Sequence, residues 1–127
     1  MTYITMRVPL EPEFLADIMI TAFDGNYGAC WAWSAPISGS FSNERSEFDS
    51  IDIHPEEWGL GEMDMTVNHE ILGLGIQRIL NADDDTPTWG VVSSVRTAVS
   101  EQDAGEIDAI GADVIVQFGL WGKVIYG

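Results

Sequence analysis

The two histidines of this chain lie close to carboxylates, a pairing that acid–base chemistry and metal binding both use. His54 is followed by Glu56 and Glu57, and His69 is followed by Glu70. A metal site needs three or four ligands, and the chain contains neither an HExxH motif nor a cluster of cysteine and histidine. We therefore interpret both as surface histidines in an acidic field, which favours their protonated form.

The consecutive carboxylates Asp83–Asp85 are a second candidate, because clustered carboxylates can bind a divalent cation. A calcium-binding loop that began at Asn81 would need glycine and glutamate where the chain has Thr86 and Val92. We interpret the run as an acidic turn before a helix rather than as a specific metal site.

Catalytic motifs are absent from the sequence. Glycines at positions 59, 61, 73, 75 and 90 lack the lysine that a phosphate-binding loop requires. No nucleophile elbow supports hydrolysis, and carboxylate pairs are too common in an acidic chain to indicate glycoside hydrolysis. Cys30 is the only cysteine, which excludes an internal disulfide, and we interpret it as a small buried residue rather than a nucleophile. The sequence predicts neither an enzyme nor a cofactor.

Net charge carries more information than any motif. The chain has 21 Asp and Glu against 5 Lys and Arg, a formal net charge of -16 in 127 residues. A charge of magnitude about 2 to 8 is enough to keep a small domain soluble. Such a surface repels nucleic acid directly, and it attracts proteins with a basic cleft, including those whose usual ligand is a phosphate backbone.

The acidic residues concentrate between positions 44 and 64, where eight carboxylates occur in 21 residues. On a strand, carboxylates two residues apart lie about 6.6 Å from each other on one side, an interval of the same order as that between successive phosphates. Trp58 lies inside this segment and suits an apolar anchor at an interface. The predicted partner-binding residues are Glu44, Glu47, Asp49, Asp52, Glu56, Glu57, Trp58, Glu62, Asp64, Asp83, Asp84 and Asp85.

Strands are predicted by alternation of apolar and polar residues. Residues 4–8 alternate, residues 29–37 form an apolar run, and residues 47–53 alternate with one slip of the kind that a bulge produces. Residues 54–65 suggest a turn followed by a short edge strand. Residues 124–126 are a candidate for a last strand.

Helices are predicted where apolar residues recur at intervals of three and four. The first spans residues 11–24, and the second runs to about Asn81 with Thr66 or Asn68 as its cap. A third begins at Thr86-Pro87, with valines 91, 92, 95 and 99 facing inward. Gly73 and Gly75 weaken the second helix by about 1 kcal/mol each relative to alanine.

Composition points to one folded domain. Hydrophobic residues make up 46 % of the chain, which is incompatible with a disordered acidic tail, and no linker divides residues 1–127. We expect an α+β fold, a small antiparallel sheet with three to four helices packed on one face. Residues 113–120, which are strongly apolar, should lie against the core. No segment has the length of a membrane span or the pattern of a signal peptide, so we expect a cytoplasmic protein.

Two segments resemble a known group. Residues 14–33, FLADIMITAFDGNYGACWAW, and residues 112–127, ADVIVQFGLWGKVIYG, are similar to the two ends of small acidic proteins encoded by phages of actinobacteria. In that group a FLAD-type helix runs into a strand that carries Trp, and an apolar helix ends the chain. The resemblance covers about 36 of the 127 residues and implies structural elements and a phage origin, without an activity or a functional residue.

These observations favour a non-catalytic inhibitor that binds a basic nucleic-acid-binding protein of the host cell. DNA mimics of the anti-CRISPR and anti-restriction classes are similar in size and charge, which makes host defence an expected target by analogy. The alternative is a structural or regulatory phage protein that forms a homo-oligomer and whose charge serves only solubility. We expect no direct contact with nucleic acid or membrane. The sequence is compatible with a monomer and with a homodimer.

Overall fold

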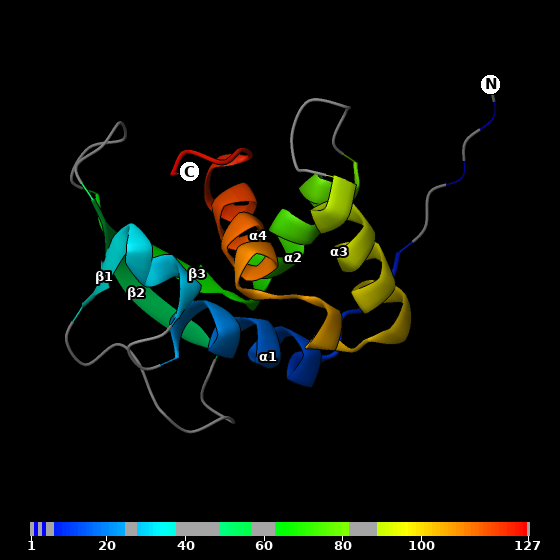
Figure 1. Cartoon of the computed structure of the whole chain (residues 1–127), viewed down its shortest axis with the longest axis horizontal. Helices are drawn as coiled ribbons and strands as arrows, with labels where there is room; N and C mark the ends of the chain where they lie inside the picture. The colour runs from blue at the N-terminus through cyan, green and yellow to red at the C-terminus, as the bar shows by residue number, and fades with distance from the viewer. Residues whose placement is uncertain are drawn as a thin grey trace.

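The computed structural model describes Thr2, Ile4 and residues 7–24, 28–37, 49–56, 63–81 and 89–126. Over these residues the chain forms four α-helices and a three-stranded antiparallel sheet, which confirms the predicted α+β domain. The sheet lies at one end of the molecule and helix α3 (Trp89–Glu101) at the other, with the remaining helices between them (Figure 1). None of the described helices is both long and apolar enough to cross a bilayer.

Helix α1 spans Pro12–Phe23 and matches its predicted range. Pro12 occupies the first helical turn, where its missing N–H is no loss. The apolar stripe read from the sequence is buried along its whole length: Phe14, Leu15, Ile18, Met19, Ala22 and Phe23. Complete burial of a large apolar side chain contributes about 1.5–3 kcal/mol, so this stripe fixes α1 to the core.

The predicted strand at residues 29–37 is wrong over its first half. A short 3₁₀-helix, η1, spans Ala29–Ala32, and strand β1 covers only Ser34–Pro36. The tight turn arises because Gly28 lies against the end of α1, where a Cβ atom would be 2.5 Å from the Cα of Phe23. Such close contact forces the chain to turn before it can extend.

The sheet has the strand order β1-β2-β3. Strand β2 spans Ser50–Pro55, within and just beyond the range predicted from alternation. The short edge strand is β3, Met65–Asn68, which shares only Met65 with the predicted range 54–65. Ile51, Ile53 and Val67 are fully buried, while the side chains that alternate with them face outward. One face of the sheet therefore closes the core, and Asp52 and His54 on the other face are partly exposed.

Helix α2 spans His69–Leu80, and Asn68 is its cap, accepting a hydrogen bond of 2.9 Å from the backbone N–H of Ile71. Helix α4 spans Ala109–Trp121, so the apolar segment predicted against the core is a helix. In α3, Val91 and Val95 are buried and Val92 and Val99 partly buried, as predicted. The proposed start of α3 at Thr86-Pro87 lies outside the described residues.

Helices α2 and α4 cross at backbone contact. A Cβ atom on Gly75 would lie 2.1 Å from the carbonyl oxygen of Ile115, and one on Gly119 would lie 2.2 Å from that of Ile71. Arg78 of α2 donates to the carbonyl oxygens of Phe118 and Gly119 at 2.7 and 3.1 Å, which satisfies carbonyls in the last turn of α4. Gly75, read from sequence as a weak point of α2, is what allows this crossing.

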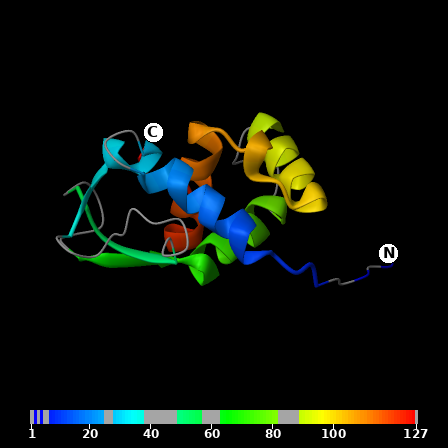
Figure 2. The same ribbon diagram turned by 90° about the horizontal axis from the view of Figure 1, so that it is seen from below.

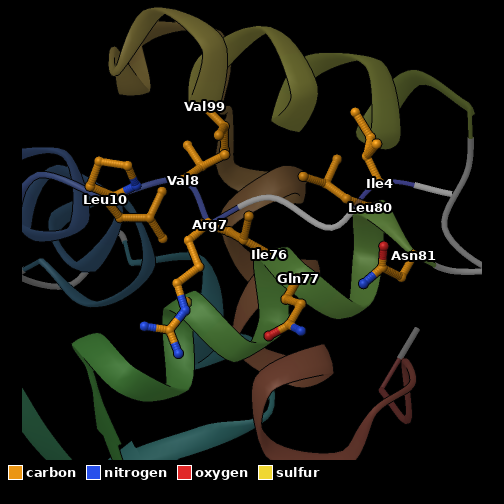
Figure 3. A pocket seen from close by; sticks show the side chains of 11 residues that line it. Ile4, Arg7, Val8, Leu10, Ile76, Gln77, Leu80, Asn81 and Val99 are labelled. Carbon is orange, nitrogen blue, oxygen red and sulfur yellow. The ribbon is translucent and has the colours of Figure 1, made fainter.

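Both predicted terminal strands are wrong. Ile4 and residues 7–10, here called the N-terminal arm, line a groove together with α2 and α3 (Figures 2 and 3), where the described residues offer no strand edge to pair with. Residues 124–126 are also not a strand, because the side chain of Gln117 binds their backbone.

We predict that Gly75→Ala and Gly119→Ala each destabilise the fold by about 3 kcal/mol or more, since the added methyl meets backbone that cannot move aside. Gly73→Ala is the matched control in the same helix, because its Cβ would meet only the Leu10 side chain at an ordinary 3.7 Å. That change should be neutral or should stabilise by up to about 1 kcal/mol. Urea unfolding followed by far-ultraviolet circular dichroism measures all three, and equal effects would contradict the close crossing.

Candidate partner-binding surface

Four of the predicted partner-binding residues are described, and all four lie on or beside β2 and β3. Asp49 precedes β2, Asp52 lies within it, Glu56 follows it, and Asp64 precedes β3. We call these four residues the acidic sheet surface. The other predicted residues lie outside the described part of the chain: Glu44, Glu47, Glu57, Trp58, Glu62, Asp83, Asp84 and Asp85.

The pleat of β2 explains why Asp52 faces outward. Its neighbours Ile51 and Ile53 are fully buried, and side chains alternate between the two faces of a strand. The antiparallel register places Thr66 of β3 opposite Asp52, and its hydroxyl donates to Asp52 Oδ1 at 2.6 Å. A strong hydrogen bond thus orients this carboxylate without removing its charge.

The two histidines join the acidic sheet surface, with partners that sequence proximity did not indicate. His54 Nδ1 lies 2.7 Å from Asp64 Oδ1, ten residues along the chain, and His69 Nε2 lies 3.8 Å from Asp49 Oδ1. The side chains of His54 and Asp64 are 44 % and 63 % exposed, which agrees with the predicted surface histidine in an acidic field. Strand register creates these pairs, and register is not readable from either histidine's own neighbourhood.

The end of β2 is fixed by the C-terminal tail. The Tyr126 hydroxyl donates to the Glu56 carbonyl oxygen at 2.7 Å, and the Glu56 N–H donates to the Trp33 carbonyl oxygen at 2.8 Å. The Tyr126 ring stacks on Trp33 with centroids 5.1 Å apart and planes 3° apart, and Trp121 contacts both rings. The position of Glu56 therefore depends on residues from the far end of the chain.

A buried glutamine holds that tail in place. Gln117 is completely buried, and its carbonyl oxygen accepts from the backbone N–H groups of Ile125 and Tyr126 at 2.8 and 2.9 Å. Its amide nitrogen donates to the Tyr126 carbonyl oxygen and to Asp113 Oδ1, both at 3.0 Å. All four hydrogen-bonding positions of the amide are filled, which is what burial of a polar group requires.

Asp113 connects this tail to the strand side of the molecule. Its Oδ1 also accepts from the Trp33 indole N–H at 2.6 Å and from the Cys30 thiol at 3.8 Å. Burial, together with the charge of Asp113, raises the pKa of the Cys30 thiol, so the thiol stays protonated at neutral pH. This agrees with the prediction that Cys30 is a buried residue without nucleophilic character.

The acidic sheet surface shows no metal-binding cluster. Within the described ranges, no three His, Cys, Asp or Glu side chains lie close enough together to hold a metal ion. Comparison with protein-family models, with curated proteins and with solved structures finds no match to this chain.

Replacement of Gln117 tests the buried amide. Gln117→Leu keeps the approximate side-chain volume but leaves Asp113 with fewer donors and frees the tail, which we expect to cost about 2–4 kcal/mol of unfolding free energy. Gln77→Leu, an exposed position on α2, is the control and should change stability by no more than about 0.5 kcal/mol. Urea titration of the parent and of both variants in dilute solution measures their unfolding free energies. Equal losses in Gln117→Leu and Gln77→Leu would show that the tail is not held by the Gln117 amide.

Tyr126 gives a pH-dependent prediction. Burial, and then the charge of Glu56, raises the pKa of the Tyr126 hydroxyl above its ordinary value of about 10. The folded protein then keeps its proton to higher pH than the unfolded chain does, so the stabilisation is complete below about pH 10 and is lost as pH rises through the folded-state pKa.

We expect Tyr126→Phe to lose about 1 kcal/mol near neutral pH, the contribution of the hydrogen bond to the Glu56 carbonyl. The variant should also show a shallower fall in stability under alkaline conditions than the parent. Urea unfolding at a series of pH values measures both effects, since the other titrating groups are common to the two proteins. Parallel curves of unfolding free energy against pH for the two proteins would contradict the raised pKa of Tyr126.

Proposed function

We propose that this protein is a non-catalytic inhibitor that occupies the nucleic-acid-binding surface of a basic host protein. The observation that carries the proposal is the gathering of Asp49, Asp52, Glu56 and Asp64 on one strand pair of a chain with a net charge of -16. The proposed inhibitor is a phage-encoded protein of the anti-CRISPR or anti-restriction class, and it acts in the host cytoplasm.

Spacing supports mimicry of a phosphate backbone. Neighbouring strands lie about 4.8 Å apart and residues rise about 3.3 Å along each strand. Thr66 lies opposite Asp52 in the register, so Asp64, two residues before Thr66, lies about 8 Å from Asp52 in regular strand geometry. Negative charges at such intervals offer lysine and arginine side chains the same kind of partner as successive phosphates do.

Rigidity also supports the proposal. Asp52 is oriented by Thr66, Asp64 by His54, and the backbone of Glu56 by Tyr126. Carboxylates that are already positioned lose less conformational entropy when a cationic partner binds. The eight predicted residues outside the described part, including the anchor Trp58, enter the proposal from the sequence alone.

A second candidate, a structural or regulatory homo-oligomer, is favoured by one observation. Large apolar side chains stay exposed on the N-terminal arm, with Ile4 83 % and Val8 53 % accessible. Large exposed apolar side chains that are grouped on one segment mark an interaction surface rather than a solvated one.

The identity of the partner is tested by capture from a host lysate. Tagged protein is incubated with an actinobacterial lysate at low and at moderate salt, and bound proteins are identified by mass spectrometry. We expect one nucleic-acid-binding protein that is released by salt or by competing duplex DNA, because exposed charge pairs are screened. A diffuse set of basic proteins, of the kind that any polyanion collects, would remove mimicry as the mechanism.

The surface itself is tested by neutralisation. The combined variant Asp49→Asn, Asp52→Asn, Glu56→Gln and Asp64→Asn should weaken capture about tenfold or more and slow association, since opposite charges steer the encounter. The matched control removes four exposed carboxylates from the helical part: Glu11→Gln, Asp24→Asn, Glu101→Gln and Glu106→Gln. Both variants have the same net charge, so equal losses would show that total charge matters and that the acidic sheet surface does not.

A further inference from the structure

Both histidines of the chain adjoin the acidic sheet surface. The sequence contains only two, His54 and His69, and both are among the described residues. His54 Nδ1 lies 2.7 Å from Asp64 Oδ1. His69 Nε2 lies 3.8 Å from Asp49 Oδ1. Two of the four carboxylates of this surface therefore have an imidazole within ion-pair distance.

Histidine is the side chain whose charge ordinarily changes between pH 5 and 8. Aspartate and glutamate are ordinarily ionised over this range, and lysine and arginine keep their protons. The Cys30 thiol, whose pKa is raised by burial, keeps its proton as well. A change of pH near neutrality therefore alters the side-chain charge of this protein at one place, the acidic sheet surface.

Carboxylates surround both imidazoles. Asp52 and Glu56 each lie two residues from His54 along the chain, and the strands paired with β2 contain no charged residue. His69 begins α2, and Glu70 follows it. The charged residues on the rest of α2 and on the helices packed against it are Arg78 on α2, Glu13 and Asp17 on α1, Arg96 and Glu101 on α3, and Asp113 on α4. Protonation of either imidazole thus places its new charge next to a carboxylate.

We propose that His54 and His69 make the acidic sheet surface a pH-dependent docking site, which binds a cationic partner at neutral to alkaline pH and binds it more weakly in acid. Each imidazolium occupies a carboxylate that would otherwise bind a lysine or arginine of the partner. With both protons bound, two of the four carboxylates are compensated from within the molecule. This inference rests on the proposed function, because it concerns regulation of the same surface.

A peptide of six arginines with blocked ends is the probe for this pH dependence, because arginine keeps its charge over the whole range. Titration calorimetry of the full chain with this peptide, at about pH 8 and about pH 5.5, gives the ratio of the two dissociation constants. An exposed charge pair changes affinity by a factor of about 1.5 to 5. We therefore expect the parent to bind the peptide roughly threefold to tenfold more weakly at the lower pH.

Removal of both imidazoles tests their role. His54→Gln with His69→Gln eliminates the titrating groups, while the glutamine amides can still donate to carboxylates. The ratio of its two dissociation constants should fall to about one, whatever its affinity at the higher pH.

The matched control moves the histidines elsewhere. It adds Ser93→His and Ser100→His, two exposed positions of α3, to the double glutamine variant. This control has as many histidines as the parent, but at the end of the molecule opposite the sheet (Figure 2). Since salt at about 0.1 M screens exposed charges more than about 10 Å apart, its ratio should also stay near one.

The outcomes separate this inference from the proposed function. If the parent does not bind the peptide at the higher pH, the acidic sheet surface is not a docking site for cations, and both proposals are wrong. If the parent binds equally at both pH values, or if the relocated histidines restore its ratio, only the pH dependence is overturned. A high ratio in the parent and a ratio near one in both variants supports it.

Discussion

Direct backbone contact between α2 and α4 is the constraint on which the rest of this structure depends. Gly75 and Gly119 bring the two helices together, and Arg78 closes the contact by binding carbonyls in the last turn of α4. Because α2 follows β3 immediately, its placement also sets the placement of the sheet. The sheet and α3 thus lie at opposite ends of one unit whose centre is the crossing of two helices (Figure 1).

A second layer of specificity comes from the buried amide of Gln117 and from Asp113, which is partly buried. Both lie on α4, and their partners come from η1, from Trp33 and from the tail. A partner placed elsewhere would leave the buried amide unsatisfied, so these hydrogen bonds select one arrangement. Asp113 Oδ1 accepts from Trp33, Cys30 and Gln117, which come from three parts of the fold.

Sequence periodicity predicted the helices because their apolar faces are continuous. The stripe of α1 and the Asn68 cap of α2 depend only on residues near in sequence. What the sequence could not supply is pairing over long distances. The terminal segments look like strands, yet the tail is held by Gln117 and the base of the arm by the hydrogen bond from the Glu11 N–H to Gln102, and neither partner is encoded locally. The acidic sheet surface was equally hard to predict, because the register of β2 against β3 pairs His54 with Asp64 and His69 with Asp49.

The stack of Tyr126 on Trp33, with Trp121 at its edge, also gives the molecule an internal optical reporter. The three rings are held in fixed mutual orientation, with centroids within 6 Å of one another. Aromatic rings in fixed tertiary packing give a near-ultraviolet dichroism signal that is lost when that packing is lost, even where helices remain. The rings come from the residue before β1, the end of α4 and the tail, so part of this signal depends on the docking of all three. Loosening of the tail should therefore reduce the near-ultraviolet signal, without any added label.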